Sequence, residues 1–283
     1  MIMKKKVLSM VMAGCMLLSM PVYAEGDDVS DTLKKYREDG FVIGADLFAP
    51  YIYEGDDGEM TGVDYDILVE VLNELGVEDI TVKSTPYESV IVELNNGNVD
   101  CTCDGMYITE ERMKQGVYFS DVTYYENDCV LINADSDIKT EDDLKDKKMA
   151  VCTGSVAVEL AEQMLADGKI GSLDYYTSND LTFQAVSSGQ ADCVLCDCFA
   201  AAPAMSEDSS FNLAYMNSYT PQLTDAIAGF GFRADEADFV AEFNDVLNEM
   251  KEDGRLKEIF EKWNMSDSVF CGVEDGKVEN LAE

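Results

Sequence analysis

Short apolar runs alternate with amphipathic stretches along most of the chain, and this alternation limits the fold more than any other feature. An apolar run at residues 41–45 precedes a stretch at 64–75 whose apolar residues recur every three or four positions. A second apolar run at 80–84, a helical stretch at 88–94 and a third run at 99–103 repeat this order. Strands that alternate with helices at this interval build an α/β fold with a mostly parallel sheet.

The same order resumes beyond Cys129 and continues almost to the end of the chain. One predicted helix begins at Thr140, where Asp143 three residues later completes a capping box. No repeat, low-complexity tract or long linker is visible, so one large domain or two lobes account for the chain. Further strands are predicted at 130–133, 149–152, 175–176, 193–196 and 225–233, and further helices at 140–145, 153–166, 179–188, 237–250 and 255–263.

The charge balance excludes one class of partner. The 283 residues include 57 acidic and 20 basic ones, a formal net charge of −37. Nucleic acid is excluded because its phosphates would be repelled. Solubility explains such a charge, and attraction of a cationic ligand is the alternative. There is no histidine, the commonest general base and metal ligand, so an enzyme would depend on carboxylates, tyrosines or cysteines. We expect no metal and no cofactor.

The first 24 residues have the pattern of an export signal. Lysines at positions 4–6 precede an apolar run at 7–20, and small residues lead to a cleavage site after Ala24. A second interpretation is a lipobox at 12–15, which would leave Cys15 lipidated and membrane-anchored, although the apolar stretch before it is short. We expect an extracytoplasmic protein (secreted, periplasmic or at the cell surface), with soluble export favoured over the lipid anchor.

Nine cysteines in an exported chain raise the question of disulfides. Their positions favour buried core thiols, because most fall in strand-like runs where a small apolar residue would serve. Disulfides remain an alternative, and metal binding is a weaker one because the spacings match no standard zinc pattern. The cysteines in such runs are Cys101, Cys103, Cys129, Cys193, Cys196 and Cys198.

Several motifs occur in a fixed order over about residues 40 to 265. Taken together they closely resemble extracellular solute-binding proteins of polar amino acid ABC transporters, the family 3 type. An ordered set of this kind is far more specific than any single motif. The motifs are IGADLFAPYIY, GVDYDILVEVLNELG, LNNGNVDCTCDGMYITEERMKQGVYFSDVTYYE, IKTEDDLKDKKMAVCTGS, SSGQADCVLCD and MKEDGRLKEIFEKW.

The resemblance implies a periplasmic-binding-protein type II fold, in which two lobes close on a small ligand. Each lobe would hold a mixed, mostly parallel sheet flanked by helices, and two crossover strands would join them. Lobe 1 would comprise residues 38–128 plus 224–268, and lobe 2 residues 129–223. Residues 269–283 would form a C-terminal tail. The implied partners are an amino acid and an ABC transporter permease, and the implied state is a monomer.

The resemblance also implies which residues hold the ligand. Arg112, in a T-x-x-R turn, matches the arginine that grips the ligand carboxylate through a planar fork; a surface salt bridge is the alternative. Gly154 and Ser155 match a helix-start loop that meets the same carboxylate, and Val156 stands where many members have a second hydroxyl. Asp197 matches the acid that receives the ligand ammonium.

Further matches lie near the first strand. Asp46, at the end of that strand, matches a position that often meets the ligand amine or side chain. Aromatic pocket walls are implied at Phe48, Tyr51, Tyr53 and Tyr87, although core packing is the usual fate of an aromatic ring. Asp64 and Asp66 also belong to a motif, and we expect both to have a structural role where a strand leads into a helix.

Two departures from the family bear on the ligand. The AGMT-like stretch of the family is here Asp104, Gly105, Met106 and Tyr107, so a small residue has become an acid and a small hydroxyl has become phenolic. Tyr107 could hydrogen-bond the ligand or stack on it. If Asp104 faces the cleft, it favours a ligand with an extra cation, such as arginine, lysine or a related amine. The alternative pairs Asp104 with a backbone amide at the strand end.

Two other functions are found on the same fold. One is a freestanding ligand sensor. The other is a cyclohexadienyl or arogenate dehydratase, in which a carboxylate in the cleft assists the loss of water. No catalytic pair is marked in this sequence, and we expect a binding protein that is not an enzyme.

Overall fold

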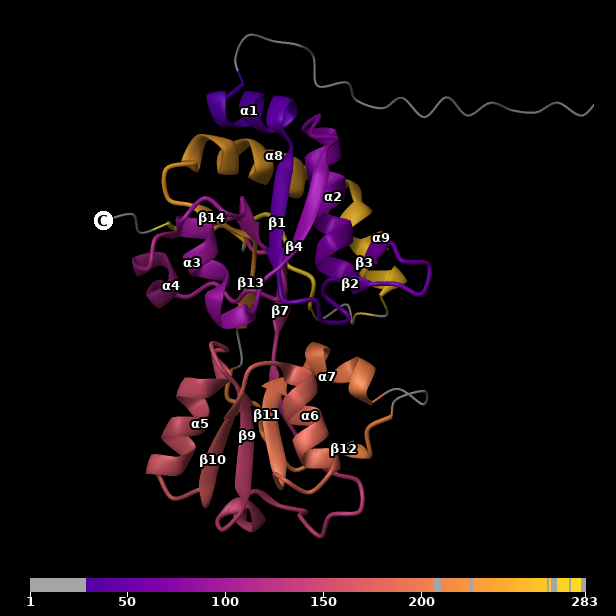
Figure 1. Ribbon diagram of the computed structural model, residues 1–283, viewed down its shortest axis with the longest axis vertical. Helices are drawn as coiled ribbons and strands as arrows, with labels where there is room; N and C mark the ends of the chain where they lie inside the picture. The colour runs from indigo at the N-terminus through magenta and orange to yellow at the C-terminus, as the bar shows by residue number, and fades with distance from the viewer. Residues whose placement is uncertain are drawn as a thin grey trace, which may run out of the picture.

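The computed structural model describes residues 29–205, 210–223, 226–263, 265, 269–274 and 276–280. These residues build two α/β bodies, lobe 1 and lobe 2, stacked along the long axis of the molecule (Figure 1). The export signal and Cys15 lie outside the described residues. Within the described chain, no helix is long and apolar enough to cross a membrane.

Lobe 1 is built on a five-stranded sheet in the order β4-β1-β5-β14-β6. The strand β1 pairs in parallel with both of its neighbours, whereas β14 runs antiparallel to β5 and β6. Helical crossovers precede β4 and β5, as parallel pairing requires. The parallel pairing predicted from the sequence is confirmed for β1 and its two neighbours. The strands are β1 (Phe41–Ala45), β4 (Ile80–Ser84), β5 (Cys101–Thr102), β6 (Val117–Phe119) and β14 (Gly231–Arg233).

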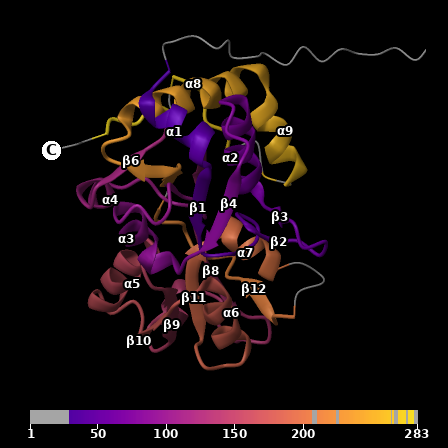
Figure 2. The same ribbon diagram turned by 45° about the horizontal axis from the view of Figure 1, so that its top comes forward.

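The helices α1 and α8 cover the end of lobe 1 that is away from lobe 2, and the other helices flank its sheet (Figure 2). The helix α8 contacts both α1 and α2, and its predicted apolar side is the buried one, with Phe239 and Phe243 fully enclosed. A short hairpin of β2 (Tyr53–Glu54) and β3 (Met60–Thr61) precedes α2. The helices are α1 (Asp31–Asp39), α2 (Val63–Glu74), α3 (Val90–Asn95), α4 (Glu110–Lys114), α8 (Ala237–Asp253) and α9 (Arg255–Lys262).

Lobe 2 repeats the plan with a sheet in the order β10-β9-β11-β8-β12. The central strand β9 pairs in parallel with β10 and β11, and β8 runs antiparallel to β11 and β12. Its strands are β8 (Asp128–Asn133), β9 (Lys148–Cys152), β10 (Ser172–Tyr176), β11 (Cys193–Asp197) and β12 (Leu213–Tyr215). Its helices are the 3₁₀ turn η2 (Glu141–Leu144), α5 (Ala157–Ala166), α6 (Asn179–Ser187) and α7 (Cys198–Ala204).

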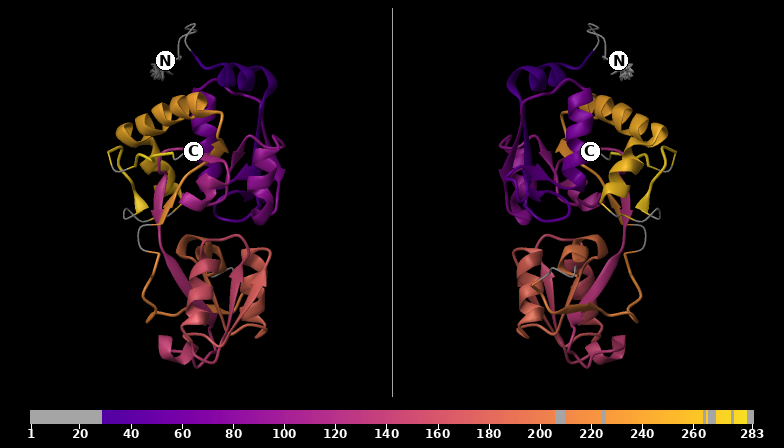
Figure 3. Two further views of the ribbon diagram at one scale, coloured as in Figure 1. Left: turned by 90° about the vertical axis from the view of Figure 1, so that its left-hand side faces the viewer. Right: turned by 90° about the vertical axis from the view of Figure 1, so that its right-hand side faces the viewer.

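Two paired strands form the hinge between the lobes. The strand β7 (Tyr124–Glu126) leads out of lobe 1 and continues almost directly into β8, while β13 (Ala226–Ala228) carries the chain back. These two strands pair antiparallel, with Glu126 opposite Ala226. Figure 3 shows the two lobes one above the other, with the chain crossing between them on one side. A narrow ribbon of this kind allows the lobes to rotate relative to each other while both stay connected.

The strand predicted at 225–233 is wrong as a single element. Residues 226–228 pair with β7 in the hinge, and residues 231–233 pair with β5 and β6 in the sheet of lobe 1. Gly229 and Phe230 separate the two pieces, and the amide of Phe230 donates to Ser120 Oγ instead of to a strand. The break lets one segment serve two sheets that do not lie in one plane.

The last described residues pack on lobe 1. The amide of Val122 donates to the carbonyl of Gly276 at 2.7 Å, and the Asn280 side chain accepts from and donates to the backbone of Phe119. Cys271 is completely buried beneath this segment. Residues 269–280 therefore belong to the packed surface of lobe 1 wherever they are described.

The described cysteines are free thiols. All eight of them lack a disulfide, and all but Cys198 are buried. Cys129 and Cys196 lie directly opposite each other on β8 and β11, with their sulfur atoms 3.9 Å apart. The prediction of buried core thiols is confirmed for the seven buried cysteines but is wrong for Cys198, which begins α7 instead of lying in a strand and is only partly buried. Among the described residues, no group of ligands is arranged to hold a metal ion.

Candidate functional site

The ends of three strands bring three aspartates together between the lobes. Asp46 follows β1 and Asp104 follows β5 in lobe 1, and Asp197 is the last residue of β11 in lobe 2. The carboxyl ends of strands are the usual place for ligand groups in α/β folds. The three face an enclosed cavity of about 20 Å³, lined by Asp46, Phe48, Tyr51, Tyr87, Asp104, Cys152, Ser155, Asn179 and Asp197.

Both arrangements considered for Asp104 are present at once. Its side chain lines the cavity and is 6% exposed, and its carboxylate also accepts a hydrogen bond from the backbone amide of Asp46. Burial, followed by the charges of Asp46, Asp64 and Asp197, raises its pKa well above the usual value. Its φ of 113° is rare for a residue with a side chain, which marks a strained position of the kind found at binding sites.

Asp64 holds the strained turn at Asp104 and Gly105 in place through hydrogen bonds. Its Oδ2 accepts from the amide of Gly105 at 2.7 Å and from the amide of Asp104 at 3.3 Å, and its Oδ1 accepts from the Tyr124 hydroxyl at 2.8 Å. Burial raises its pKa to about 6 despite these donors. Gly105 has a φ of 60°, and a Cβ at that position would lie 2.8 Å from the Tyr51 ring. Asp64 thus has the structural role expected from the sequence.

Arg112 lies between the lobes rather than on the surface. The Thr109 side chain caps its helix, and the arginine is 6% exposed. Nη1 donates to the carbonyl of Tyr107 at 2.7 Å, and Nη2 donates to the Tyr87 hydroxyl and to the carbonyl of Gly154, both at 3.1 Å. The bond to Gly154 crosses from lobe 1 to lobe 2. The alternative interpretation of Arg112 as part of a surface salt bridge is therefore wrong. Capture of a ligand carboxylate by Arg112 stays a prediction.

A second bond across the cleft joins Tyr107 to Asp197. The Tyr107 hydroxyl donates to Asp197 Oδ1 at 2.5 Å. Tyr107 is 4% exposed and forms an isolated β-bridge with Ala228 at the hinge, so its backbone is fixed near the pivot of the two lobes. Burial is the main cause that raises the pKa of Asp197 to about 6, while the Tyr107 hydroxyl and Arg112 lower it.

The loop before α5 differs in detail from what the resemblance implies. Gly154 offers its carbonyl to Arg112, and the Ser155 hydroxyl donates to the carbonyl of Cys152 at 2.8 Å. Val156 immediately precedes α5, and its side chain lines a neighbouring groove instead of the cavity. A Cβ on Gly154 would lie 3.2 Å from Cα of Glu88, so glycine at this position permits the close approach of the lobes.

The aromatic residues divide into two groups. Phe48, Tyr51 and Tyr87 line the cavity, whereas Tyr53 packs edge-on against Trp263 with ring centroids 6.1 Å apart. Tyr53 is therefore not a wall of this cavity. The guanidinium carbon of Arg112 lies 5.6 Å from the centre of the Tyr87 ring, and burial raises the pKa of that phenol.

Sequence reasoning did not identify Cys152 and Asn179 as cavity residues. Asn179 is the first residue of α6 and Cys152 the last of β9, so both lie at element ends that face the cleft. Nothing in their sequence context separates them from ordinary helix-start and strand residues. Only the packing of one lobe on the other brings them to the cavity.

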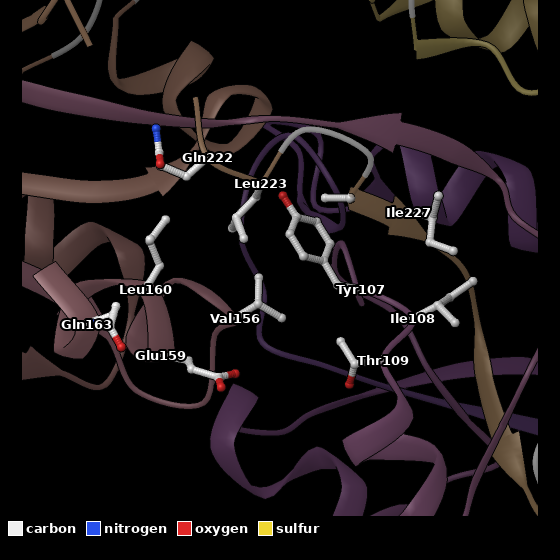
Figure 4. A pocket seen from close by; sticks show the side chains of 11 residues that line it. Tyr107, Ile108, Thr109, Val156, Glu159, Leu160, Gln163, Gln222, Leu223 and Ile227 are labelled. Carbon is white, nitrogen blue, oxygen red and sulfur yellow. The ribbon is translucent and has the colours of Figure 1, made fainter. Parts of the chain in front are cut away.

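A wider groove adjoins the cavity beside the hinge. It has a volume of about 610 Å³ and is lined by both apolar and polar residues. Figure 4 shows Val156, Leu160 and Leu223 of lobe 2 facing Tyr107, Ile108 and Ile227 of lobe 1 across it. Tyr107 borders this groove while its hydroxyl bonds to Asp197 in the cavity wall. Its ring therefore separates the groove from the cavity.

The family model for bacterial extracellular solute-binding proteins, family 3, matches residues 41–266. The chain belongs to this family. It is 26% identical over 256 residues to the L-cystine-binding protein TcyJ of Escherichia coli (strain K12), which covers 89% of this chain and 92% of the relative. It is 30% identical over 262 residues to the arginine-binding extracellular protein ArtP of Bacillus subtilis (strain 168), covering 92% and 98%.

Solved structures of related proteins have the same fold. An ancestral arginine-binding protein bound to arginine superposes with a TM-score of 0.71 at 27% identity, covering 79% of this chain and 97% of that one. An ancestral amino acid-binding protein described as a precursor of cyclohexadienyl dehydratase gives the same TM-score at 28% identity. The periplasmic-binding-protein type II fold predicted from the sequence is confirmed.

Proposed function

We propose that this protein binds a basic amino acid between its two lobes and delivers it to the permease of an ABC transporter. The observation that carries the proposal is the charge of the cavity. Asp46, Asp104 and Asp197 line it, and Arg112 is the cation beside it. Burying carboxylates without counter-charges is costly, so a ligand that brings positive charge is favoured over a neutral or acidic one.

The two ends of an amino acid find complementary groups in this arrangement. Asp197 offers a carboxylate for the α-ammonium, and Arg112 offers a planar fork for the α-carboxylate. Asp46 and Asp104 then remain for a second basic group. In Asp46, burial outweighs the hydrogen-bonding partners and raises the pKa, and the nearby charge of Asp180 acts in the same direction. A guanidinium or ammonium at this place would relieve the repulsion among these acids.

Closure of the hinge supplies the mechanism. The cavity of about 20 Å³ has room for about one water molecule, whereas sites for small molecules are typically about 300–1,000 Å³. The lobes therefore open to admit a ligand and close on it, and the ligand favours the closed state because it contacts both lobes there. The closed form is the one that we expect the permease to bind.

Binding measurements test this proposal. The exported protein is titrated with arginine, lysine, glutamine and glutamate by calorimetry, and its unfolding temperature is measured with each. We expect arginine or lysine to bind most tightly and glutamate not to bind. Tightest binding of glutamate would refute the proposal. Turnover of arogenate would show that the fold has an enzymatic role here instead.

We further propose that the protein is exported as a soluble monomer cleaved after Ala24. The family is extracellular, and the pattern at residues 22–24 fits such a cleavage. The intact mass of the protein recovered from the producing cells is the test. A mass that begins at Glu25 supports soluble export, and a lipid-modified mass that begins at Cys15 supports the anchor.

A further inference from the structure

Three glutamates of the described chain have a side-chain oxygen that is buried and has no hydrogen-bond partner. In Glu74 and Glu236, the other oxygen lies against an arginine, Arg255 and Arg233 respectively. In Glu126, the other oxygen accepts only from the Tyr51 hydroxyl, at 2.5 Å. The described residues provide Glu126 with no ion pair, so its negative charge lacks the counter-charge that the other two have.

Glu126 lies at the hinge and beside the ligand cavity at once. It is the last residue of β7, opposite Ala226 of the returning strand, and it is 4% exposed. The tyrosine that donates to it, Tyr51, lines the cavity with its ring. The unpartnered Oε2 is therefore enclosed next to the binding site and away from solvent.

Glu126 also lies close to Asp197 of lobe 2, because Asp197 pairs with Asp128, two residues beyond Glu126, and the amide of Cys198 donates to the carbonyl of Asn127 at 2.8 Å. Burial raises the pKa of Glu126 well above its usual value, and the charge of Asp197 is the next largest cause. Tyr107, which donates to Asp197, has its pKa raised by burial and by the charges of both acids. Two carboxyl groups, one from the hinge and one from lobe 2, thus lie near each other, with two phenols as their donors.

We propose that Glu126 is a ligand-binding residue that shares the α-ammonium of the bound ligand with Asp197. The inference rests on the proposed function and extends it, because it assigns an acid on the hinge to ligand binding. A nitrogen between these two carboxylates gives Oε2 of Glu126 the partner that it lacks. Asp46 and Asp104 form the second acidic pair, so the site selects a ligand with two basic nitrogens.

The proposal has a consequence that a structural role for Glu126 would not have. In the unliganded protein, the buried carboxylate of Glu126 lowers the stability of the fold, because no described residue compensates its charge. Replacing it with glutamine keeps the shape and the acceptor for Tyr51 but removes the charge. Glu126→Gln should therefore leave the unfolding temperature of the unliganded protein unchanged or higher, while weakening the binding of a basic ligand.

Calorimetric titration of the exported protein is the experiment, with lysine, glutamine and 1,5-diaminopentane as probes. We expect Glu126→Gln to lower the affinities for lysine and for glutamine about tenfold or more each, because both carry the α-ammonium that Glu126 shares with Asp197. Glu236→Gln is the matched control, because Glu236 is also buried and also accepts from a tyrosine, Tyr36, at 2.6 Å. It has an arginine partner and lies outside the cavity, so it should leave both affinities unchanged.

The possible results separate this inference from the proposed function. Unchanged lysine affinity in Glu126→Gln, a loss for lysine but not for glutamine, or a lowered unfolding temperature without ligand would each overturn the inference alone. Binding of the diamine but of no amino acid would overturn the proposed function. In that case a loss of diamine affinity of about tenfold in Glu126→Gln would support the role of Glu126, and an unchanged affinity would overturn it. Failure of every probe to bind the wild type would overturn both.

Discussion

Two buried carboxyl groups, Asp64 next to the strained turn and Asp197 in the cavity wall, lower the stability of the fold when they are ionised. Asp64 and Asp197 both have a pKa raised from the ordinary 3.8 to about 6, mainly by burial. A carboxyl whose pKa is higher in the folded chain than in the unfolded chain destabilises the fold wherever it is ionised. This cost is absent below pH 3.8 and complete above about pH 6.

Lowering the pH should therefore stabilise the unliganded protein and weaken the binding of its ligand. From pH 7.5 to pH 5.5 we expect the unfolding temperature without ligand to rise by about 2–6 °C. The affinity for lysine should fall over the same range, because protonated carboxyls lose their charge. Scanning calorimetry at high salt checks this, since salt screens the surface charges but not the buried ones. A falling unfolding temperature would contradict the assigned pKa values.

Arg112 is the residue for which carboxylate capture can be tested. Arg112→Ala should lower ligand affinity by about a hundredfold, because the ligand carboxylate would lose a buried bidentate partner. Arg112→Lys should recover little of the loss, since an ammonium cannot supply the planar fork. Calorimetric titration measures both variants.

The matched control for Arg112 is Lys114→Ala on the same helix, where the lysine forms only an exposed pair with Glu110. It should bind like the wild type, and wild-type affinity in Arg112→Ala would exclude the arginine from the site.

At this scale, the sequence predicts candidate residues well and their partners poorly. Seven of the nine cavity residues are predicted from the resemblance, because motif positions at strand ends are recognisable without coordinates. The direction in which the Asp104 side chain points could not be predicted, since it depends on a strained turn. Asp64 holds this turn by accepting hydrogen bonds from its backbone amides. Glu126 was not predicted either, because its lack of an ion pair with any described residue is a property of the packed hinge.

At the scale of elements, the turn before α2 controls the position of Tyr51. Gly62 precedes this helix with a φ of 138°, and a Cβ there would lie 2.1 Å from the Tyr51 carbonyl oxygen. That same oxygen accepts from the amides of Asp64 and Tyr65 in the first turn of α2. The helix start and the aromatic wall of the cavity are therefore fixed by one backbone contact.

Gly62→Ala should destabilise the protein by about 3 kcal/mol or more, because strain and a backbone clash add together. Gly97→Ala is the control, since that glycine has a φ of 71° with no atom within 4 Å of an added Cβ. Its cost should be about 1–2 kcal/mol, the strain alone. Urea unfolding of both variants gives the comparison, and equal costs would show that the Tyr51 contact yields without penalty.

Element types were predictable where periodicity was strong, and element ends were not. The buried stripe of α8 lies on the predicted residues, because a 17-residue amphipathic helix carries many repeats of the pattern. The strand predicted at 99–103 is shorter, at Cys101–Thr102, because the chain turns into the strained Asp104. The helix predicted from residue 153 begins at Ala157, since the preceding loop bonds to β9 and to Arg112 instead.

At the scale of the whole molecule, two hydrogen bonds between described side chains and backbone join the lobes across the cleft. One joins Arg112 to Gly154 and the other joins Tyr107 to Asp197. Both also involve residues proposed to hold the ligand, so a ligand must replace these contacts as it closes the hinge. The balance between open and closed forms without ligand therefore depends on them.

Tyr107→Phe tests this balance, because it removes one of the two bonds without removing the ring. A buried hydrogen bond to a carboxylate contributes about 1–3 kcal/mol, enough to shift the population of the closed form about tenfold. Small-angle scattering should show a larger radius of gyration for the unliganded variant than for the wild type. The control is Tyr219→Phe, which removes a tyrosine bond to Asp128 within lobe 2 and should leave the radius unchanged. An equal radius in Tyr107→Phe and the wild type would mean that closure does not depend on this bond, and Arg112 would then be the contact that holds the lobes together.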